Sequence, residues 1–263
     1  MSFRILFITQ DDPFYVRLFF EEFFKTYRSL DEIAGVVIAQ AMGKKSVFEL
    51  ARQMYDFYGS LDFLRMGLRY AAYKSLAVAP TFLKANGHYT LEQLSRYYEL
   101  DVIHQSDINA KPFLTKLEGM NLDLIISVAA PVIFKRNLIE LPKHGCINIH
   151  HAPLPKYRGM MPNFWQLYHG EKSVGMTIHE INPGIDDGRI ILQKDVDIRP
   201  EETLDSLIKR TKKIGSYFMV EAINLIKSGS VEYMDNPATE GTYFSFPTRE
   251  DVKEFKRRGK KIM

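Results

Sequence analysis

The sequence predicts an α/β fold in which a mostly parallel β-sheet is covered by helices on both faces. Short apolar runs of strand length alternate with longer segments whose apolar residues recur at helical spacing. The runs are apolar almost throughout, as expected of strands that are buried on both faces. Such an alternation is typical of sheets whose parallel strands are connected by helices.

Five apolar runs predict strands before residue 151, namely 4–9, 34–40, 100–104, 123–128 and 146–150. Aromatic residues on the inner face of 14–27 predict a helix between the first two strands. The first strand is followed by Gln10-Asp11-Asp12-Pro13 and not by a G-x-G-x-x-G pattern. A dinucleotide site of the usual kind is therefore not supported.

Residues 46–83 fall outside this alternation. Phe48, Ala51, Tyr55 and Tyr58 recur at helical spacing, which predicts one or two helices inserted between the second and third strands. We interpret this aromatic stripe as core packing. The alternatives are a subunit contact, which would give a homodimer, or a lid over the substrate.

The second half of the chain continues the pattern. Residues 175–182 and 189–196 are strand-like, and 200–226 form a long amphipathic helix closed by a lysine and a glycine at 227 and 229. We therefore expect a catalytic domain over 1–228, with a helical insert at about 46–83, and a short C-terminal extension over 229–263.

Composition excludes several classes of protein. Of the 263 residues, 46% are hydrophobic and 25% charged, an ordinary globular composition. The longest apolar runs are shorter than the roughly 20 residues of a membrane helix, and the N-terminus lacks a signal-peptide layout. One cysteine cannot build an intramolecular disulfide framework. We expect a cytoplasmic protein that does not insert into a membrane.

The net charge of +3 is concentrated near the C-terminus. Its basic residues are Lys253, Lys256, Arg257, Arg258, Lys260 and Lys261. We interpret them as a solvated terminus, with contact to phosphate or RNA as the alternative.

The residues that point to chemistry lie in the segment 145–193. Asn148 and His150 are two apart on a predicted strand, so they share one face at its carboxyl end, where open α/β sheets bind ligands. An amide can donate to an oxyanion, and a histidine can exchange a proton near neutral pH. Asp186 or Asp187 would supply the carboxylate of a group suited to acyl transfer. The residues alone do not choose between the two.

The histidines of this region allow other interpretations. A histidine on a strand is commonly a core or loop residue, and His144, His150, His151 and His169 together raise the question of a zinc site. No H-x-x-x-H or C-x-x-C pair is present, and His150 and His151 would point to opposite faces of a strand. We expect no metal.

The same segment resembles the formyltransferase superfamily, which includes glycinamide ribonucleotide transformylase, methionyl-tRNA formyltransferase, formyltetrahydrofolate deformylase and sugar N-formyltransferases. Three motifs in register carry the resemblance: Asn148-Ile149-His150, Leu154-Pro155-Lys156-Tyr157-Arg158-Gly159 and Ile185-Asp186-Asp187-Gly188. It implies a Rossmann-like formyltransferase fold. It also implies 10-formyltetrahydrofolate as the formyl donor, a primary amine as the acceptor, and no metal.

The resemblance also implies a role for each residue. It selects Asp186 over Asp187 as the catalytic carboxylate, and it implies that Asn148 and protonated His150 stabilise the oxyanion. The donor's pterin would lie along Ala130, Pro131, Val132, Ile133 and Phe134, with Ile139 behind and Ile181 and Ile185 on the other side. The alternative is that 132–134 are plain core.

The acceptor depends on features that vary within the superfamily. The tRNA enzymes carry a further C-terminal barrel, for which 229–263 is too short, and the purine enzyme lacks an insert such as 46–83. Pro162-Asn163-Phe164-Trp165 is similar to a loop of the sugar enzymes. We therefore expect a nucleotide-linked amino sugar, contacted by Arg158, Asn163, Phe164 and Trp165. A tRNA acceptor, hydrolysis of 10-formyltetrahydrofolate and a catalytically silent folate-binding protein are the alternatives.

Overall fold

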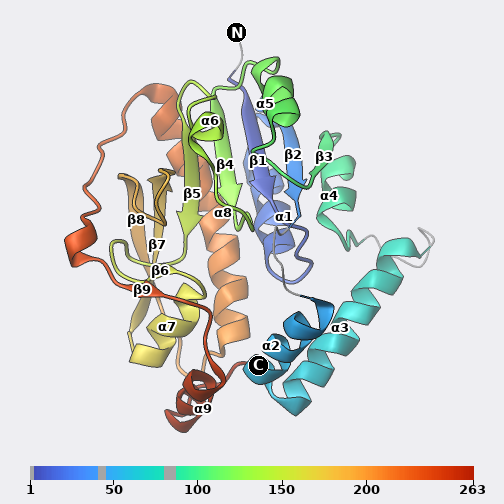
Figure 1. Cartoon of the computed structure of the whole chain (residues 1–263), viewed down its shortest axis with the longest axis vertical. Coiled ribbons are helices and arrows are strands. Elements are labelled where there is room, and N and C mark those ends of the chain that lie inside the picture. Colours follow the sequence, from blue (N-terminus) through green and yellow to red (C-terminus); the bar gives the residue numbers. More distant parts are fainter. Residues whose placement is uncertain (1–2, 41–45, 80–86) are drawn as a thin grey trace.

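The computed structural model describes residues 3–40, 46–79 and 87–263. A seven-stranded sheet runs through it in the order β3-β2-β1-β4-β5-β7-β8 (Figure 1). The strands are β1 (Ile5–Thr9), β2 (Ile33–Ala39), β3 (Val102–Gln105), β4 (Leu124–Val128), β5 (Cys146–His150), β7 (Ser173–Glu180) and β8 (Ile190–Asp197). All neighbours up to β5 are parallel, whereas β7 runs antiparallel to both β5 and β8. The predicted mostly parallel sheet is confirmed.

Helices cover both faces of this sheet. On one face, α1 (Val16–Thr26) and α8 (Leu204–Ser228) pack against Ile5 and Phe7 of β1. On the other face, α5 (Lys111–Glu118) and α6 (Arg136–Ile139) pack against Leu6 and Ile8. Because alternate residues of β1 point to opposite faces, a strand in this position must be apolar throughout.

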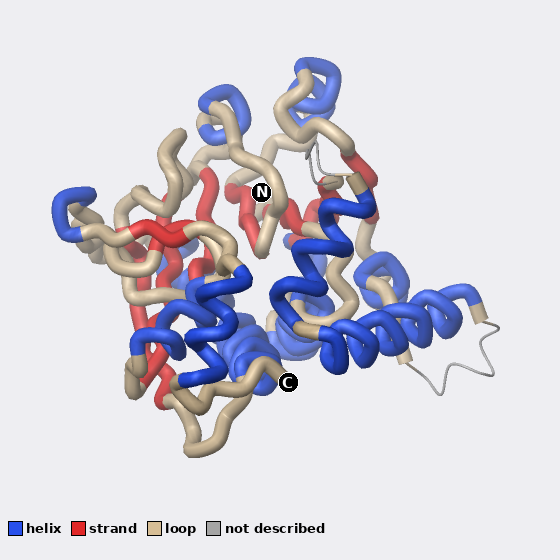
Figure 2. The backbone as a smooth tube through the Cα atoms, turned by 60° about the horizontal axis from the view of Figure 1, so that its bottom comes forward, coloured by secondary structure: helices blue, strands red, loops and turns tan. Residues whose placement is uncertain are grey.

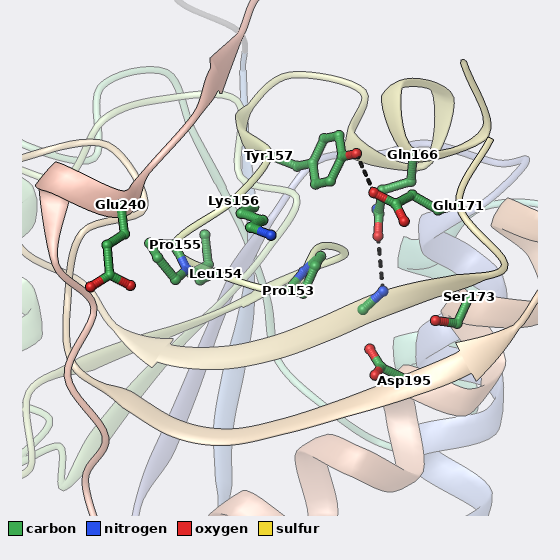
Figure 3. Close-up of a pocket in the computed structure, with 11 residues that line it drawn as sticks. Pro153, Leu154, Pro155, Lys156, Tyr157, Gln166, Glu171, Ser173, Asp195 and Glu240 are labelled. Carbon is green, nitrogen blue, oxygen red and sulfur yellow. Dashed lines mark hydrogen bonds between the residues drawn. The ribbon is translucent and has the colours of Figure 1, made fainter. Parts of the chain in front are cut away.

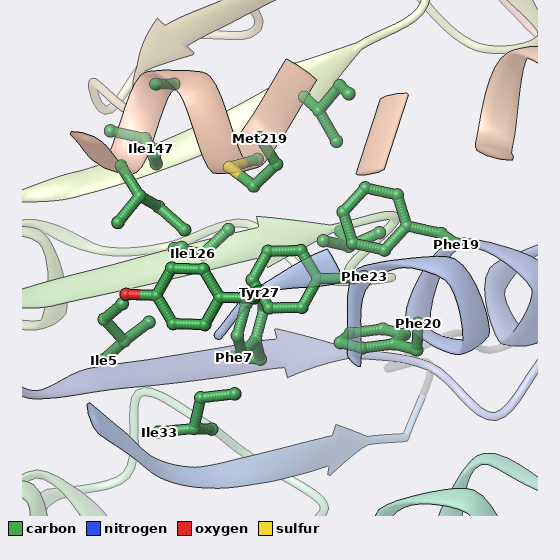
Figure 4. Close-up of a cluster of buried hydrophobic side chains, with 14 of the residues drawn as sticks. Ile5, Phe7, Phe19, Phe20, Phe23, Tyr27, Ile33, Ile126, Ile147 and Met219 are labelled. Atoms are coloured by element: carbon green, nitrogen blue, oxygen red, sulfur yellow. The ribbon is translucent and has the colours of Figure 1, made fainter. Parts of the chain in front are cut away.

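Aromatic rings dominate the core under α1, as Figure 4 shows. The ring of Phe7 meets those of Phe20 and Phe23 edge to face, with centroids 5.3 Å and 5.0 Å apart. Phe23 also stacks on Tyr27 at 5.1 Å. Each fully buried aromatic side chain of this kind contributes about 1.5–3 kcal/mol of apolar burial. The predicted inner aromatic face of the helix is confirmed.

Helix α8 follows the predicted amphipathic pattern. The Thr203 hydroxyl caps its start by accepting from Ser206 N, and Gly229 ends it at φ 66°. The backbone N–H groups of Leu204 and Asp205, which have no partner within the helix, donate to the carbonyls of Lys261 and Ile262. No helix in the described ranges is both long and apolar enough to cross a membrane.

The insert is helical over its described residues 46–79, whereas the predicted 80–83 lie outside them. It contains α2 (Val47–Tyr58), which starts with a capping box at Ser46, and α3 (Ser60–Val78), the long helix at the right-hand rim of Figure 2. The core-packing interpretation of the stripe is wrong for Phe48 and Tyr55, which are 76% and 46% exposed. The buried aromatic residue of α2 is Phe57, because that side of the helix faces Phe164 and Phe246.

The C-terminal extension is ordered against the core. It contains η3 (Ala238–Glu240), β9 (Tyr243–Phe244) and α9 (Arg249–Arg257), and β9 pairs with β6 (Arg158–Gly159). Phe255 of α9 is buried and stacks on Phe164 at 4.6 Å. Further short elements are η1 (Leu30–Glu32), α4 (Leu91–Tyr97) and α7 (Pro162–His169).

The terminus that carries the basic residues packs on the core, but their side chains stay at the surface, where Lys253, Lys256, Arg257, Arg258 and Lys261 are exposed. Lys253 pairs with Glu250, Arg257 and Arg258 pair with Glu254, and Lys261 pairs with Glu201. These exposed pairs add little stability individually. They do reduce the positive charge that this face presents to an anionic partner.

Candidate functional site

Asn148, His150 and Asp186 come together at the carboxyl end of β5. Asn148 and His150 lie on the same face of the strand, and Asp186 approaches from the loop between β7 and β8. The Oδ2 atom of Asp186 lies 3.6 Å from Nδ1 of His150. The neighbouring Asp187 makes no such contact among the described residues, and its Oδ1 is buried without a hydrogen-bond partner there. The geometry thus groups the three residues that the motifs single out.

The tautomer of His150 follows from its contacts. Its Nε2 lies 2.8 Å from the carbonyl oxygen of Tyr157. Because a carbonyl only accepts hydrogen bonds, Nε2 carries a hydrogen and donates it. Nδ1 is then the atom that faces Asp186 and exchanges a proton, and the Tyr157 carbonyl holds the ring in this orientation.

His179 of β7 is a site residue that the sequence reasoning missed. Its Nδ1 lies 2.7 Å from the Glu180 carbonyl, so Nδ1 carries the hydrogen, and Nε2 accepts a hydrogen bond of 3.2 Å from Nδ2 of Asn148. Burial lowers the pKa of His179 to about 4, so the ring is neutral at pH 7. This contact uses one N–H of the Asn148 amide, and no described residue takes the other, which can meet a ligand.

The backbone around Asp186 is unusual. Asp186 itself has φ 50°, a left-handed conformation that aspartate tolerates better than most residues. Its Oδ2 accepts a hydrogen bond of 2.8 Å from the backbone N–H of Gly159. At Gly188 an added Cβ would lie 1.8 Å from the Glu180 carbonyl oxygen, so only glycine fits there. The loop is therefore tightly fixed on β7.

The predicted pterin-binding residues separate into exposed and supporting groups. Ile133 and Ile185 are 65% and 48% exposed. Ala130, Pro131 and Val132 are half-buried. Phe134 is buried in the core, and Ile139 and Ile181 pack against it. The segment thus presents exposed apolar side chains that are supported by buried ones, as the binding of a flat heteroaromatic ring requires.

The residues predicted to contact the acceptor lie inside the protein. Phe164 is fully buried, and Asn163 and Trp165 are nearly so. Asn163 donates to the Thr211 hydroxyl, and Trp165 donates to the Ser245 carbonyl. Arg158 is also buried, and its Nη2 donates to Asn236. These side chains offer no open face for stacking on a sugar or base, because α7 packs between α8, α9 and β9.

A second group of titratable residues lies on the opposite face of β5. His151 is buried with both ring nitrogens lacking hydrogen-bond partners among the described residues, and burial lowers the pKa of His151. Burial also lowers the pKa of Lys212 on α8, to about 8, although Asp12 raises it. Burial raises the pKa of Asp12, which accepts from the N–H groups of Phe14 and Tyr15. The charge of Lys212 thus acts on both Asp12 and His151.

A cavity of about 350 Å³ lies beside the loop that follows β5 (Figure 3). Its lining includes Pro153 and Tyr157, and the Tyr157 hydroxyl donates to Glu171 at 2.6 Å. Neither Asn148, His150 nor Asp186 lines it. Within residues 3–40, 46–79 and 87–263, no three His, Cys, Asp or Glu side chains are grouped to hold a metal ion. That no metal is needed stays a prediction.

Comparisons with known proteins agree with this geometry. Residues 84–223 match the family described as Formyl transferase. The methionyl-tRNA formyltransferase of Thermotoga neapolitana is 33% identical over 205 residues, which are 74% of this chain and 66% of that protein. A second methionyl-tRNA formyltransferase, from Thermodesulfovibrio yellowstonii, is 39% identical over 119 residues. The matching part of the chain spans only 66% and 39% of these two relatives.

Solved structures share the fold at lower identity. Glycinamide ribonucleotide transformylase 1 from Symbiobacterium toebii has a TM-score of 0.59 and 17% identity, over 86% of this chain and 89% of that one. The N-formyltransferase of Helicobacter canadensis, solved with folinic acid and dTDP-3-aminofucose, has a TM-score of 0.58 and 18% identity, over 95% and 72%. The predicted Rossmann-like formyltransferase fold is confirmed.

Proposed function

Because the chain belongs to the formyl transferase family, we propose that it transfers a formyl group from 10-formyltetrahydrofolate to a primary amine. One observation carries this proposal. Asn148, His150 and Asp186 converge beside a partly open apolar loop, with His150 Nδ1 3.6 Å from Asp186 Oδ2. A hydrogen-bond donor, a proton-exchanging group and a carboxylate are the parts that acyl transfer to an amine needs.

The proposed reaction gives each of the three side chains a role. The neutral amine attacks the formyl carbon, and the carbonyl oxygen becomes an oxyanion that accepts hydrogen bonds from the free N–H of Asn148 and from Nδ1–H of protonated His150. Asp186 takes the proton that the attacking nitrogen must lose, directly or through one water. The oxyanion then re-forms the carbonyl as the bond from the formyl carbon to N10 breaks, and N10 of tetrahydrofolate takes up the proton that Asp186 holds. No covalent enzyme intermediate forms.

The formyl donor would bind along the loop after β4. Ile133 and Ile185 are the exposed apolar side chains that a pterin ring can cover, and Ala130, Pro131 and Val132, which precede Ile133, are half-buried. Phe134, Ile139 and Ile181 support this edge from the core. The residues present therefore fit the co-substrate.

We propose a nucleotide-linked amino sugar as the acceptor. The fold can hold a folate and such a sugar together, as in the H. canadensis protein. The second candidate is methionyl-tRNA, which the 33% identity to a tRNA enzyme favours.

A release assay tests the proposal. The protein is supplied with 10-formyltetrahydrofolate and, separately, with nucleotide-linked amino sugars, methionyl-tRNA and glycinamide ribonucleotide, and tetrahydrofolate is measured. We expect release that depends on an amino sugar and that matches the formylated product one to one. Release only with methionyl-tRNA would select the second candidate. Release of tetrahydrofolate without any acceptor would indicate hydrolysis. Folate binding without release would contradict the proposal that the protein is an enzyme.

Two further predictions accompany this function. From the sequence we expect a cytoplasmic protein and a homodimer, and both stay predictions. Cell fractionation tests the first, and light scattering of the purified protein tests the second.

A further inference from the structure

The C-terminal extension returns across the molecule to the loop that carries Asp186. Met234 and Ile190 exchange two backbone hydrogen bonds of 2.9 Å, which fix the extension to the start of β8. Further along, β9 pairs with β6, so that Tyr243 lies opposite Arg158 and Phe244 opposite Gly159. In Figure 1 this segment descends beside β8 at the left of the view and turns back through η3 to β9. Asn236 lies between the two attachments.

The side chain of Asn236 bonds to three different groups. Its Nδ2 donates to the backbone carbonyls of Asp186 and Gly188, each at 2.9 Å. Its Oδ1 accepts a hydrogen bond of 2.8 Å from Nη2 of Arg158. An asparagine amide has two N–H donors and one acceptor oxygen, so all of its polar atoms are used here. The two carbonyls belong to the turn in which Asp186 has its left-handed φ.

Arg158 gives Asn236 a second connection to Asp186. The residue after Arg158 is Gly159, whose N–H donates to the Asp186 carboxylate at 2.8 Å. Gly159 has φ 93°, and an added Cβ would lie 2.3 Å from the Phe244 carbonyl oxygen, so β6 has little freedom to shift against β9. Asn236 therefore binds the backbone of Asp186 directly. Through Arg158 it also holds Gly159, whose N–H donates to the Asp186 side chain.

We propose that Asn236 is a positioning residue that holds the Asp186 carboxylate at its distance from His150, and that residues 234–244 are part of the catalytic unit. The proposal deepens the proposed function and rests on it. Asp186 has to meet His150 Nδ1 and a substrate nitrogen at once, so a displacement of about 1 Å is enough to reduce turnover about 100-fold. Without the Asn236 amide, two carbonyls of the turn lose their donor and the left-handed residue loses its support.

The test compares three forms of the full-length protein. Asn236→Ala removes all of the side-chain contacts. Asn236→Asp keeps the acceptor for Arg158 but removes the donor to the carbonyls. Glu232→Gln changes an exposed residue of the same extension, outside 234–244, and serves as the matched control. We expect kcat for formyl transfer to fall about 10- to 100-fold in both Asn236 variants. The KM for 10-formyltetrahydrofolate should change less than about threefold, because the pterin loop is not contacted.

Amide hydrogen exchange supplies a readout that does not depend on turnover. In Asn236→Ala, peptides covering 157–161 and 182–189 should exchange faster, while peptides of β1 and α1 remain as in the wild type. Wild-type kcat in both Asn236 variants, or unchanged exchange in these peptides, would overturn the positioning role. Faster exchange throughout the chain would also overturn it, because the residue would then be structural. If the wild type itself transfers no formyl group, the proposed function fails, and the exchange result alone decides the role of Asn236.

Discussion

The carboxyl edge of the sheet and the α2–α3 insert are built in opposite ways. At the edge, Asp186 is held by Gly159 and Asn236, which are 27 and 50 residues away in sequence. In the insert, the ends of the helices are set by neighbours in sequence, such as the Ser46–Glu49 capping box. The edge buries its polar groups, whereas the insert exposes apolar ones at Leu61, Leu64 and Leu68. A substitution at the carboxyl end of the strands should therefore change the rate of the reaction. A substitution in the insert should change only the protein surface.

The largest effect is expected from the two groups that would exchange protons. His150→Ala and Asp186→Asn should each lower kcat by about 100- to 10,000-fold while the melting temperature stays near that of the wild type. Asparagine adopts the left-handed conformation of residue 186 as readily as aspartate does, so Asp186→Asn preserves the loop. The measurements are formyl-transfer kinetics and thermal unfolding. Turnover like that of the wild type in either variant would contradict the proposed site.

An intermediate effect concerns stability in acid. The folded-state pKa of His179 is about 4, below its ordinary value of 6.5, because the ring is buried. Between these pH values the unfolded chain binds a proton that the folded chain does not. The free energy of unfolding should therefore fall as pH is lowered through this window, by about 3 kcal/mol from this residue at pH 4.

The variant His179→Gln separates this contribution from the rest. Urea unfolding at pH 7 and pH 4.5 should show a smaller loss of stability in the variant than in the wild type, whatever its stability at pH 7. His151, whose pKa burial also lowers, keeps part of the acid sensitivity in both proteins. An equal loss in the two proteins would show that His179 is not the group that titrates.

The smallest effect on turnover is expected in the insert. Leu64→Ser changes an exposed side chain of α3, so kcat should stay within about twofold and the free energy of unfolding within about 0.5 kcal/mol. A tenfold loss of kcat would instead indicate that the insert closes over the substrate as a lid. If the predicted homodimer forms through α3, light scattering will show a lower mass for this variant than for the wild type.

Most strands could be predicted because their signal is local. The apolar runs at 34–40, 123–128 and 146–150 correspond to β2, β4 and β5 within a few residues. The spacing of Asn148 and His150 was sufficient to put both on one face, since that follows from the geometry of any strand. The α1 and α8 patterns were equally clear, because both helices lie on the sheet and show one apolar side each.

The remaining features depend on contacts between distant segments. His179 meets Asn148 only because β7 pairs antiparallel with β5 in one register, Asn148 opposite His179. Whether Phe48 or Phe57 of α2 is buried depends on which side meets α7, and helical spacing does not contain that information. The burial of Phe164 similarly depends on Phe255 of α9. Sequence motifs identify residue types here, but tertiary packing decides which of them a ligand can reach.

The return of the C-terminal extension has a consequence for the order of synthesis. The ribosome completes β1 to β8 and α8 before it adds Asn236, which follows Asp186 by 50 residues. The carbonyls of Lys261 and Ile262 that cap the start of α8 arrive later still. The strands and the apolar loop after β4 are therefore synthesised before Asn236, and the turn of Asp186 gains the two hydrogen bonds from Asn236 only afterwards. Chains that terminate before residue 236 would lack the two hydrogen bonds that hold this turn.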